Sequence, residues 1–314
     1  MRRLIGLMVL CGVLLASLVM AEEKPVQHRL IGADRGKITI LNTKGEVEWQ
    51  IDNPFVVHDM QVLPNGNVIY QSDPKTLVEI TKDKEVVWKY TCTPKDDYKG
   101  AIEVHGFQRL KNGLTMIAES GNRRIIEVNR EGAIVKEVPI TVDHPNSHRD
   151  TRRVRKLDNG HYLASHEGDG VVREYDDKGT VVWSYKLELG GRPRSDGHDG
   201  HGVEVFNAVR LKNGNTLIAG GNNNRVLEVN KSGEIVWSVD YNELPGIRLY
   251  WVTSLQVLPN GHIIIGNTHA GPDNPQLIEI TKAKKVVWTL KNWDVFGNDL
   301  CATQVLDVKG SVIR

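Results

Sequence analysis

The histidines of this 314-residue chain are the first residues whose types and spacing suggest chemistry. His58 and His105 each stand seven residues before an Asn-Gly pair, and Arg152 has the same position in a third, similar segment. An imidazole can act as a base or a nucleophile, and a guanidinium can hold an anion. We therefore predict catalytic roles for His58, His105 and Arg152. The alternative is that the two histidines only hydrogen-bond the neighbouring backbone.

Other polar residues are candidates for binding rather than catalysis. Four are predicted to contact a ligand: His148, Arg149, His166 and His269. The arginines of segment 147–156 suit phosphate, sulfate or carboxylate, although they could instead form salt bridges on a solvated strand edge. The stretch "GGRPRSDGHDGHGVE" offers metal ligands in His198, Asp199 and His201, with an ordinary polar surface loop as the alternative. A metal is thus compatible with the sequence, but no cofactor is required by it.

These residues lie within a repeat that is marked by Asn-Gly pairs. The pairs are separated by 47, 47, 54 and 47 residues, and Lys309-Gly310 follows after 49; they begin at Asn65, Asn112, Asn159, Asn213 and Asn260. Asn-Gly suits a two-residue hairpin turn in which both central residues have positive φ. We therefore expect each unit to start with such a hairpin.

A second pattern runs between the Asn-Gly pairs. Short strands such as "GEVEW" and "GEIVW" end in tryptophan in five units, at Trp49, Trp88, Trp183, Trp237 and Trp288, whereas "GAIVK" has Lys136. Another strand precedes each of them, so each unit holds four short antiparallel strands. Four-stranded units of about 47 residues are typical of β-propeller blades, which must stack in a ring to cover their apolar faces.

The two ends of the repeat predict how the ring closes. Six innermost strands can be counted, the last being "ATQVLDV", and its missing partners are found near the N-terminus as "RLIGAD", "KITILN" and "EVEWQI". We expect an all-β, six-bladed propeller of four-stranded antiparallel blades, the last blade closed by both termini. "SVIR" competes with "RLIGAD" for one position. His58, His105 and Arg152 then lie at one mouth of the central channel, opposite the Asn-Gly turns.

The N-terminal segment differs from the rest of the chain. Arg2 and Arg3 precede an apolar run, and Val19-Met20-Ala21 offers small residues for cleavage, so residues 1–21 are predicted to be a signal peptide. A retained membrane anchor is the alternative. Residues 22–314 would form a single propeller domain in a secreted or periplasmic protein, with no membrane span after cleavage. That compartment would permit a disulfide between Cys92 and Cys301.

The charge balance bears on the class of partner. The chain has 40 Lys and Arg against 39 Asp and Glu, which argues against a mainly electrostatic nucleic-acid binder. C-x-x-C, Walker and G-x-S-x-G motifs are absent from the sequence. We expect a monomer whose partner is a small anionic or aromatic ligand, or another protein.

Two family resemblances follow from these motifs. The G-x-x-x-W pattern at Gly45–Trp49 and its counterparts resembles the repeat of quinoprotein (PQQ)-like propellers. The quinone-dependent dehydrogenases among them have eight blades and a vicinal cysteine pair, which this chain lacks, so PQQ is not expected. The run "HDMQVLPNGN", from His58 to Asn67, is similar to the repeat of bacterial arylsulfotransferases, which are secreted six-bladed propellers.

The second resemblance implies an activity. In arylsulfotransferases a channel histidine takes the sulfuryl group from an aryl sulfate and passes it to a phenol, while other histidines and an arginine stabilise the sulfuryl oxygens. Of the matching residues, His58 carries over by motif, and His105 and Arg152 carry over by register. Either His58 or His105 would then be the nucleophile, with Arg152 and the other imidazole holding the oxyanion charge. We expect the additional N-terminal domain of that family to be absent, since the repeat begins within a few residues of the predicted signal peptide. The rival hypothesis is a non-catalytic propeller that binds a protein or small ligand on the histidine-bearing face.

Overall fold

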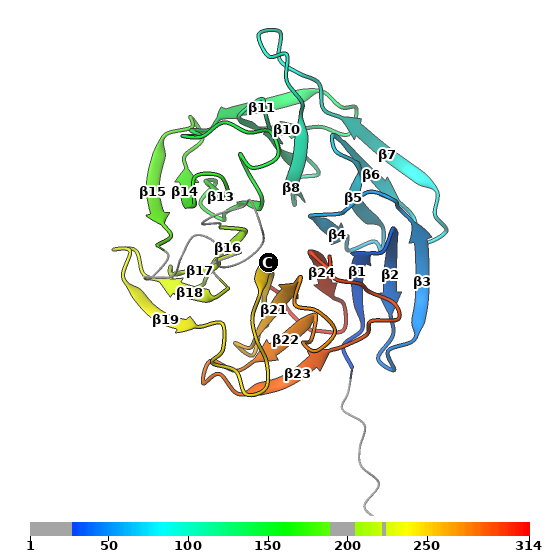
Figure 1. Ribbon diagram of the computed structural model, residues 1–314. Helices are drawn as coiled ribbons and strands as arrows, with labels where there is room; N and C mark the ends of the chain where they lie inside the picture. Colours follow the sequence, from blue (N-terminus) through cyan, green and yellow to red (C-terminus); the bar gives the residue numbers. More distant parts are fainter. Residues whose placement is uncertain (1–26, 189–204, 222–223) are drawn as a thin grey trace, which may run out of the picture.

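A computed structural model describes residues 27–188, 205–221 and 224–314. Its strands form six four-stranded antiparallel sheets, arranged as blades around a central axis (Figure 1). The described residues contain no helix. The prediction of an all-β, six-bladed propeller is therefore confirmed. The predicted signal peptide, residues 1–21, lies outside the described part of the chain.

The first three complete blades follow one another in the sequence, each running from the channel outward. Blade 1 comprises β4 (Met60–Val62), β5 (Val68–Asp73), β6 (Thr76–Ile80) and β7 (Val86–Thr91). Blade 2 comprises β8 (Glu103–Arg109), β9 (Thr115–Ser120), β10 (Arg124–Val128) and β11 (Ile134–Pro139). Blade 3 comprises β12 (Val154–Lys156), β13 (Tyr162–His166), β14 (Val171–Tyr175) and β15 (Val181–Lys186).

The remaining blades complete the ring. Blade 4 comprises β16 (Asn207–Arg210), β17 (Thr216–Ala219), β18 (Val226–Val229) and β19 (Ile235–Val239). Blade 5 comprises β20 (Trp251–Val257), β21 (Ile263–Thr268), β22 (Leu277–Ile280) and β23 (Val286–Leu290). Blade 6 joins β24 (Ala302–Val305) to β1 (Leu30–Asp34), β2 (Lys37–Leu41) and β3 (Val47–Asp52).

Blade 6 confirms the predicted closure by both ends of the chain. β1 pairs antiparallel with β24, with Leu30 opposite Val305, so "RLIGAD" takes the disputed position. "SVIR" lies elsewhere: Ile313 forms an isolated bridge with Val257 at the end of β20. The guanidinium of Arg314 then donates to the carbonyl of Met60 at 2.6 Å, which brings the C-terminus to the centre of the ring (Figure 1).

The Asn-Gly turns differ from the predicted two-residue form. The amide of Gly66 donates to the carbonyl of Leu63 at 2.9 Å, and the amide of Leu63 donates to the carbonyl of Asn67. Only Gly66 has positive φ, at 85°, whereas Asn65 does not. This is a type I turn followed by a left-handed glycine. Pro64 favours it because its ring fixes φ near the value that the second turn residue needs.

The repeated tryptophans join each blade to the next. The indole N–H of Trp49 donates to the carbonyl of Lys82 at 2.8 Å, across from blade 6 to blade 1. Trp88, Trp183 and Trp237 make the equivalent bonds to Arg130, Lys231 and Lys282. Lys136 replaces tryptophan in blade 2, where its ammonium lies 5.7 Å from the ring of Tyr162. The pattern in the sequence thus reflects contacts between blades rather than within them.

Glutamine side chains link neighbouring innermost strands by hydrogen bonds. Gln61 and Gln108 each accept a hydrogen bond from a backbone amide of the next innermost strand, at 2.9 and 3.0 Å. Gln256 and Gln304 do the same, at 2.9 Å each. Because neighbouring innermost strands share no sheet, these side chains fix their relative register. Polar side chains thus link four of the six pairs of neighbouring innermost strands.

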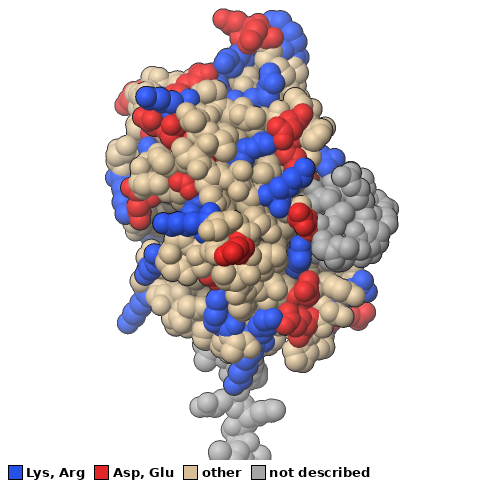
Figure 2. Space-filling model, turned by 90° about the vertical axis from the view of Figure 1, so that its left-hand side faces the viewer, with Lys and Arg blue, Asp and Glu red and all other residues tan. Residues whose placement is uncertain are grey.

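Two further expectations can be compared with the structure. Cys92 and Cys301 are both buried and free, so they form no disulfide. Within the described ranges, no helix has the length and apolarity needed to cross a bilayer. Figure 2 shows basic and acidic side chains interspersed over one side of the propeller, in keeping with the near-neutral net charge.

Candidate active site

The innermost strands bring the three predicted catalytic residues together at one end of the channel, which we call the histidine end. The rings of His58 and His105 lie 4.6 Å apart between centroids. The guanidinium of Arg152 lies 5.3 Å from the ring of Phe206, and that ring lies 6.4 Å from the ring of His58. Equivalent positions in adjacent blades explain this convergence. Their catalytic role stays a prediction.

Arg152 is held in place by a buried ion pair. Its Nε donates to the carboxylate of Glu167, and both side chains are fully buried. Its Nη2 donates to Nε2 of His148 at 3.1 Å. Its Nη1 is buried and has no hydrogen-bond partner within the described residues. A buried N–H without an acceptor costs about 1–3 kcal/mol, so Nη1 suits an oxygen of a bound ligand.

His58 is neutral at the pH of most cells. Burial lowers the pKa of its ring well below 6.5, and the neighbouring His105 and Arg152 lower it further. Nδ1 of His58 is buried and has no partner among the described residues, while its backbone amide donates to Gln71 at 3.0 Å. A neutral imidazole keeps a lone pair, which is what a base or nucleophile requires.

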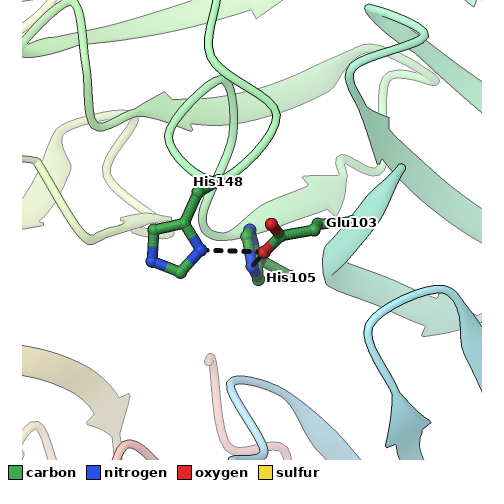
Figure 3. A group of neighbouring side chains, drawn as sticks. All are labelled: Glu103, His105 and His148. Carbon is green, nitrogen blue, oxygen red and sulfur yellow. Dashed lines mark hydrogen bonds and ion pairs between the residues drawn. The ribbon is translucent and has the colours of Figure 1, made fainter. Parts of the chain in front are cut away.

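Glu103 connects His105 to His148 (Figure 3). One carboxylate oxygen, Oε2, lies 3.0 Å from Nε2 of His105 and 2.8 Å from Nδ1 of His148. Burial and Arg152 lower the pKa of His105 to about 4, although Glu103 opposes this shift. The hydrogen bonds to both histidines hold the pKa of Glu103 well below its usual range. The alternative that His105 hydrogen-bonds the backbone also holds in part, because its Nδ1 lies 3.0 Å from the Thr151 carbonyl.

Sequence reasoning missed Glu103, although a signal existed. Glu103 stands two residues before His105 on β8, and residues two apart on a strand point to the same face. It also missed Glu167 as the partner of Arg152. Glu167 follows β13 directly, so its placement depends on how the loop after that strand turns.

The remaining predicted ligand-binding residues lie in different surroundings. His166 is fully buried, and its two ring nitrogens contact the carbonyl of Asp150 at 2.7 Å and the hydroxyl of Tyr175 at 2.8 Å. Arg149 lies at the histidine end, with Nε 3.9 Å from Glu167. These contacts tie His166 into blade 3 and leave Arg149 at the rim.

His269 directly follows β21 in blade 5. Its Nε2 contacts the carboxylate of Asp299 at 2.6 Å, and its ring lies 4.6 Å from that of Trp251. The predicted metal ligands His198, Asp199 and His201 fall outside the described residues. The ligand-binding roles of all these residues stay predictions.

A second charged layer lies below the histidines. Asp59 is buried and accepts hydrogen bonds from Arg153 and, at 2.7 Å, from Arg155. Burial alone would raise the pKa of Asp59, but the two arginines outweigh it and lower the pKa to about 2. Arg153, a candidate anion-binding residue from its place in a basic segment, is thus paired inside the channel.

Comparison with known proteins supports the fold. No protein-family model matches the sequence, and no curated protein matches it. A protein of unknown function from Bacteroides caccae is similar at 24% identity and a TM-score of 0.74, over 88% of this chain and 98% of that one. A streptogramin B lyase is similar at 15% identity and a TM-score of 0.55, over 84% and 83%.

A third similar structure is a catalytically inactive virginiamycin B lyase from Staphylococcus aureus with quinupristin. It has 14% identity and a TM-score of 0.53, over 85% of both chains. At these identities the likeness shows the propeller fold alone. The resemblances to quinoprotein-like and arylsulfotransferase repeats therefore stay predictions.

Proposed function

We propose that this protein is an enzyme that transfers an oxyanion group, specifically a sulfuryl group from an aryl sulfate to a phenol, at the histidine end of the channel. One observation carries the proposal. A neutral, buried His58 packs against a second imidazole beside Arg152, whose Nη1 has no acceptor within the described residues. The repeat that begins at His58 and resembles that of arylsulfotransferases supports the choice of substrate.

The chemistry divides into two displacements on sulfur. The lone pair of the His58 ring forms an N–S bond while the S–O bond to the aryl group breaks, and the electron pair leaves with the phenolate. The oxygen of the second phenol then attacks sulfur, the N–S bond breaks, and the phenol proton is released to solvent. Arg152 donates from Nη1 to a sulfuryl oxygen in both steps, where charge develops.

The proposal is tested with 4-nitrophenyl sulfate as donor and phenol as acceptor. We expect release of 4-nitrophenolate, and His58→Ala should lower the rate at least about 100-fold. His161→Ala is a matched control, because His161 lies beside an Asn-Gly turn and pairs with Glu174 at 2.8 Å. No turnover by the wild-type protein, or equal turnover by His58→Ala, would overturn the proposal.

The second candidate is non-catalytic binding on the same face. His148 is 46% and Arg149 27% exposed at the rim, so both can contact a partner without entering the channel. This candidate predicts no turnover, together with a small anionic ligand or protein whose capture is weakened by Arg149→Ala. Capture unchanged by that variant would count against it.

A further inference from the structure

We propose that Glu103, His105 and His148 bind a first-row transition-metal dication, such as Zn²⁺, beside His58. Oε2 of Glu103 lies 3.0 Å from Nε2 of His105 and 2.8 Å from Nδ1 of His148 (Figure 3). All three candidate ligand atoms lie within 4.8 Å of one another. Two ligands at the tetrahedral angle on Zn²⁺, with bonds of about 2.1 Å, are about 3.4 Å apart. Both contacts with Glu103 are somewhat shorter than that, so small side-chain movements would place the three atoms around one ion.

The surroundings of His105 favour a cation. Nδ1 lies 3.0 Å from the carbonyl of Thr151, and Nε2 lies 3.0 Å from the carboxylate of Glu103. Both oxygens only accept hydrogen bonds, whereas a neutral imidazole carries one N–H. A proton on Nδ1 serves Thr151, as in most metal-binding histidines, whose second nitrogen donates to a carbonyl or carboxylate. A metal ion then occupies the side where Nε2 and Glu103 would otherwise repel each other.

His148 supplies a ligand that can adjust. It precedes β12 on the connection between blades, and its side chain is 46% exposed, so its ring can move toward the other two ligands. Its Nε2 accepts from Arg152, because a guanidinium only donates, so Nδ1 carries the proton toward Glu103. A metal bound at Nδ1 of His148 displaces the proton from that nitrogen, and Nε2 becomes the protonated nitrogen of the ring. Nε2 can then no longer accept a hydrogen bond from Nη2 of Arg152, so this N–H becomes available to an anionic ligand, in addition to Nη1.

The ligand set indicates the class of metal and the type of site. Two imidazole nitrogens and one carboxylate oxygen suit Zn²⁺, Fe²⁺ or Co²⁺ better than Mg²⁺ or Ca²⁺. Three protein ligands leave coordination positions for water or substrate, as in catalytic rather than structural sites. The metal would also offset the negative charge of Glu103, which otherwise opposes an anion at the histidine end.

The chain contains its own control. Glu279 also contacts two histidines, but through different oxygens: Oε2 lies 2.9 Å from His28, and Oε1 lies 2.7 Å from His262. The second nitrogen of His28 faces Asp307 at 3.0 Å. Among the described residues, only the Glu103 group gathers three ligand atoms within reach of one ion. Glu279→Gln is therefore a charge-matched counterpart of Glu103→Gln.

The test is calorimetric titration of Zn²⁺ into the chelator-treated full chain. We expect one ion to bind at this site with a Kd at or below about 1 μM. Glu103→Gln and His148→Ala should each weaken binding at least about 100-fold, and Glu279→Gln by less than about 2-fold. Circular dichroism of each variant checks that the fold is kept, and Co²⁺ absorption reports nitrogen ligation in the wild type.

Two outcomes would overturn the proposal: no Zn²⁺ binding by the wild type, or binding by Glu103→Gln as tight as by Glu279→Gln. A doubly protonated His105 in place of the metal would give the first outcome. Aryl sulfate turnover, measured with and without Zn²⁺, separates this inference from the proposed function. Binding without turnover would reject sulfuryl transfer only, and turnover without binding would reject the metal only.

Discussion

Two groups in this propeller have the same composition and differ in arrangement. Glu103 meets His105 and His148 at the histidine end, and Glu279 meets His28 and His262 beside the Asn260-Gly261 turn. In the first group both histidines contact one carboxylate oxygen. In the second, each histidine has an oxygen of its own. A shared oxygen brings the ligand atoms together, whereas separate oxygens spread them into ordinary ion pairs.

The surroundings also shift the pKa values of the histidines in opposite directions. His28 lies part-exposed between two carboxylates, and its hydrogen bond to Glu279 is the main cause of its raised pKa, against the effect of burial. His105 lies fully buried near Arg152, and its pKa is lowered to about 4. Residue type alone therefore does not show whether a histidine forms an ion pair, binds a metal or acts as a nucleophile. Its burial and the nearest charged group determine which of these roles it can have.

The largest expected effect is a loss of folding stability at acid pH that is caused by His166, another buried histidine whose pKa is lowered. Burial, then Arg173, lowers the pKa of this ring from 6.5 to about 4, so the unfolded chain takes up a proton first as the pH falls. The contribution of His166 to stability should be lost between about pH 6.5 and pH 4 and amounts to about 3 kcal/mol.

Urea unfolding at pH 7, 5.5 and 4.5 measures this loss. The variant His166→Gln should be less stable than the wild type at pH 7 and should lose less on acidification. An equal loss in both proteins would show that His166 is not the group responsible.

A smaller effect is expected from Tyr175→Phe. The hydroxyl of Tyr175 contacts Nε2 of His166 at 2.8 Å, and its removal leaves a buried nitrogen without a partner. The expected cost in unfolding free energy is about 1–2 kcal/mol. Thermal unfolding measures it, and Zn²⁺ affinity should stay unchanged because the hydroxyl of Tyr175 bonds to Thr141 and His166 and to none of the three proposed ligands. A change in metal affinity would mean that the two histidine environments are coupled.

The smallest effect on the free energy of unfolding is expected from Glu279→Gln. Its pH dependence is opposite to that of His166, because the contribution is lost as the pH rises rather than as it falls. Because the pKa of His28 is raised, the stabilisation by Glu279 is complete below about pH 6.5 and is lost as the pH rises through the folded pKa. After screening by solvent, the cost of the variant should be below about 1 kcal/mol at pH 6 and smaller still at pH 9. Urea unfolding at both values checks this. A cost that grows with pH would contradict the assigned charge of His28.

The sequence was sufficient for the architecture because every unit repeats the same two signals. The Asn-Gly spacing and the tryptophans gave six blades and the closure, since each signal reports a contact that all blades need. The turn type at Asn65 escaped prediction because contacts beyond the Asn-Gly pair set it: the glycine amide donates to the carbonyl three residues earlier, and Oδ1 of the asparagine accepts from the amide two residues on, with or without a preceding proline. A general preference of Asn-Gly for hairpins carries no information on those neighbours.

The candidate site was predictable only where it follows the strand register. His58, His105 and Arg152 occupy one repeat position, so the ring geometry brings them together. Glu103 does not occur at that position, and His148 lies on a connection whose path depends on packing against Arg152. For His166, the sequence could not show that Asp150 and Tyr175 occupy both ring nitrogens.

The pairing of β1 with β24 has a consequence for synthesis of the chain. Leu30 leaves the ribosome long before its partner Val305, which follows it by 275 residues (305 − 30). Until β24 is made, β1 has an unpaired edge in blade 6. This edge could pair with strands of other chains, so the growing chain must be protected from such contacts. Assembly of the ring therefore waits for the last strand, and formation of so distant a contact should make refolding slow.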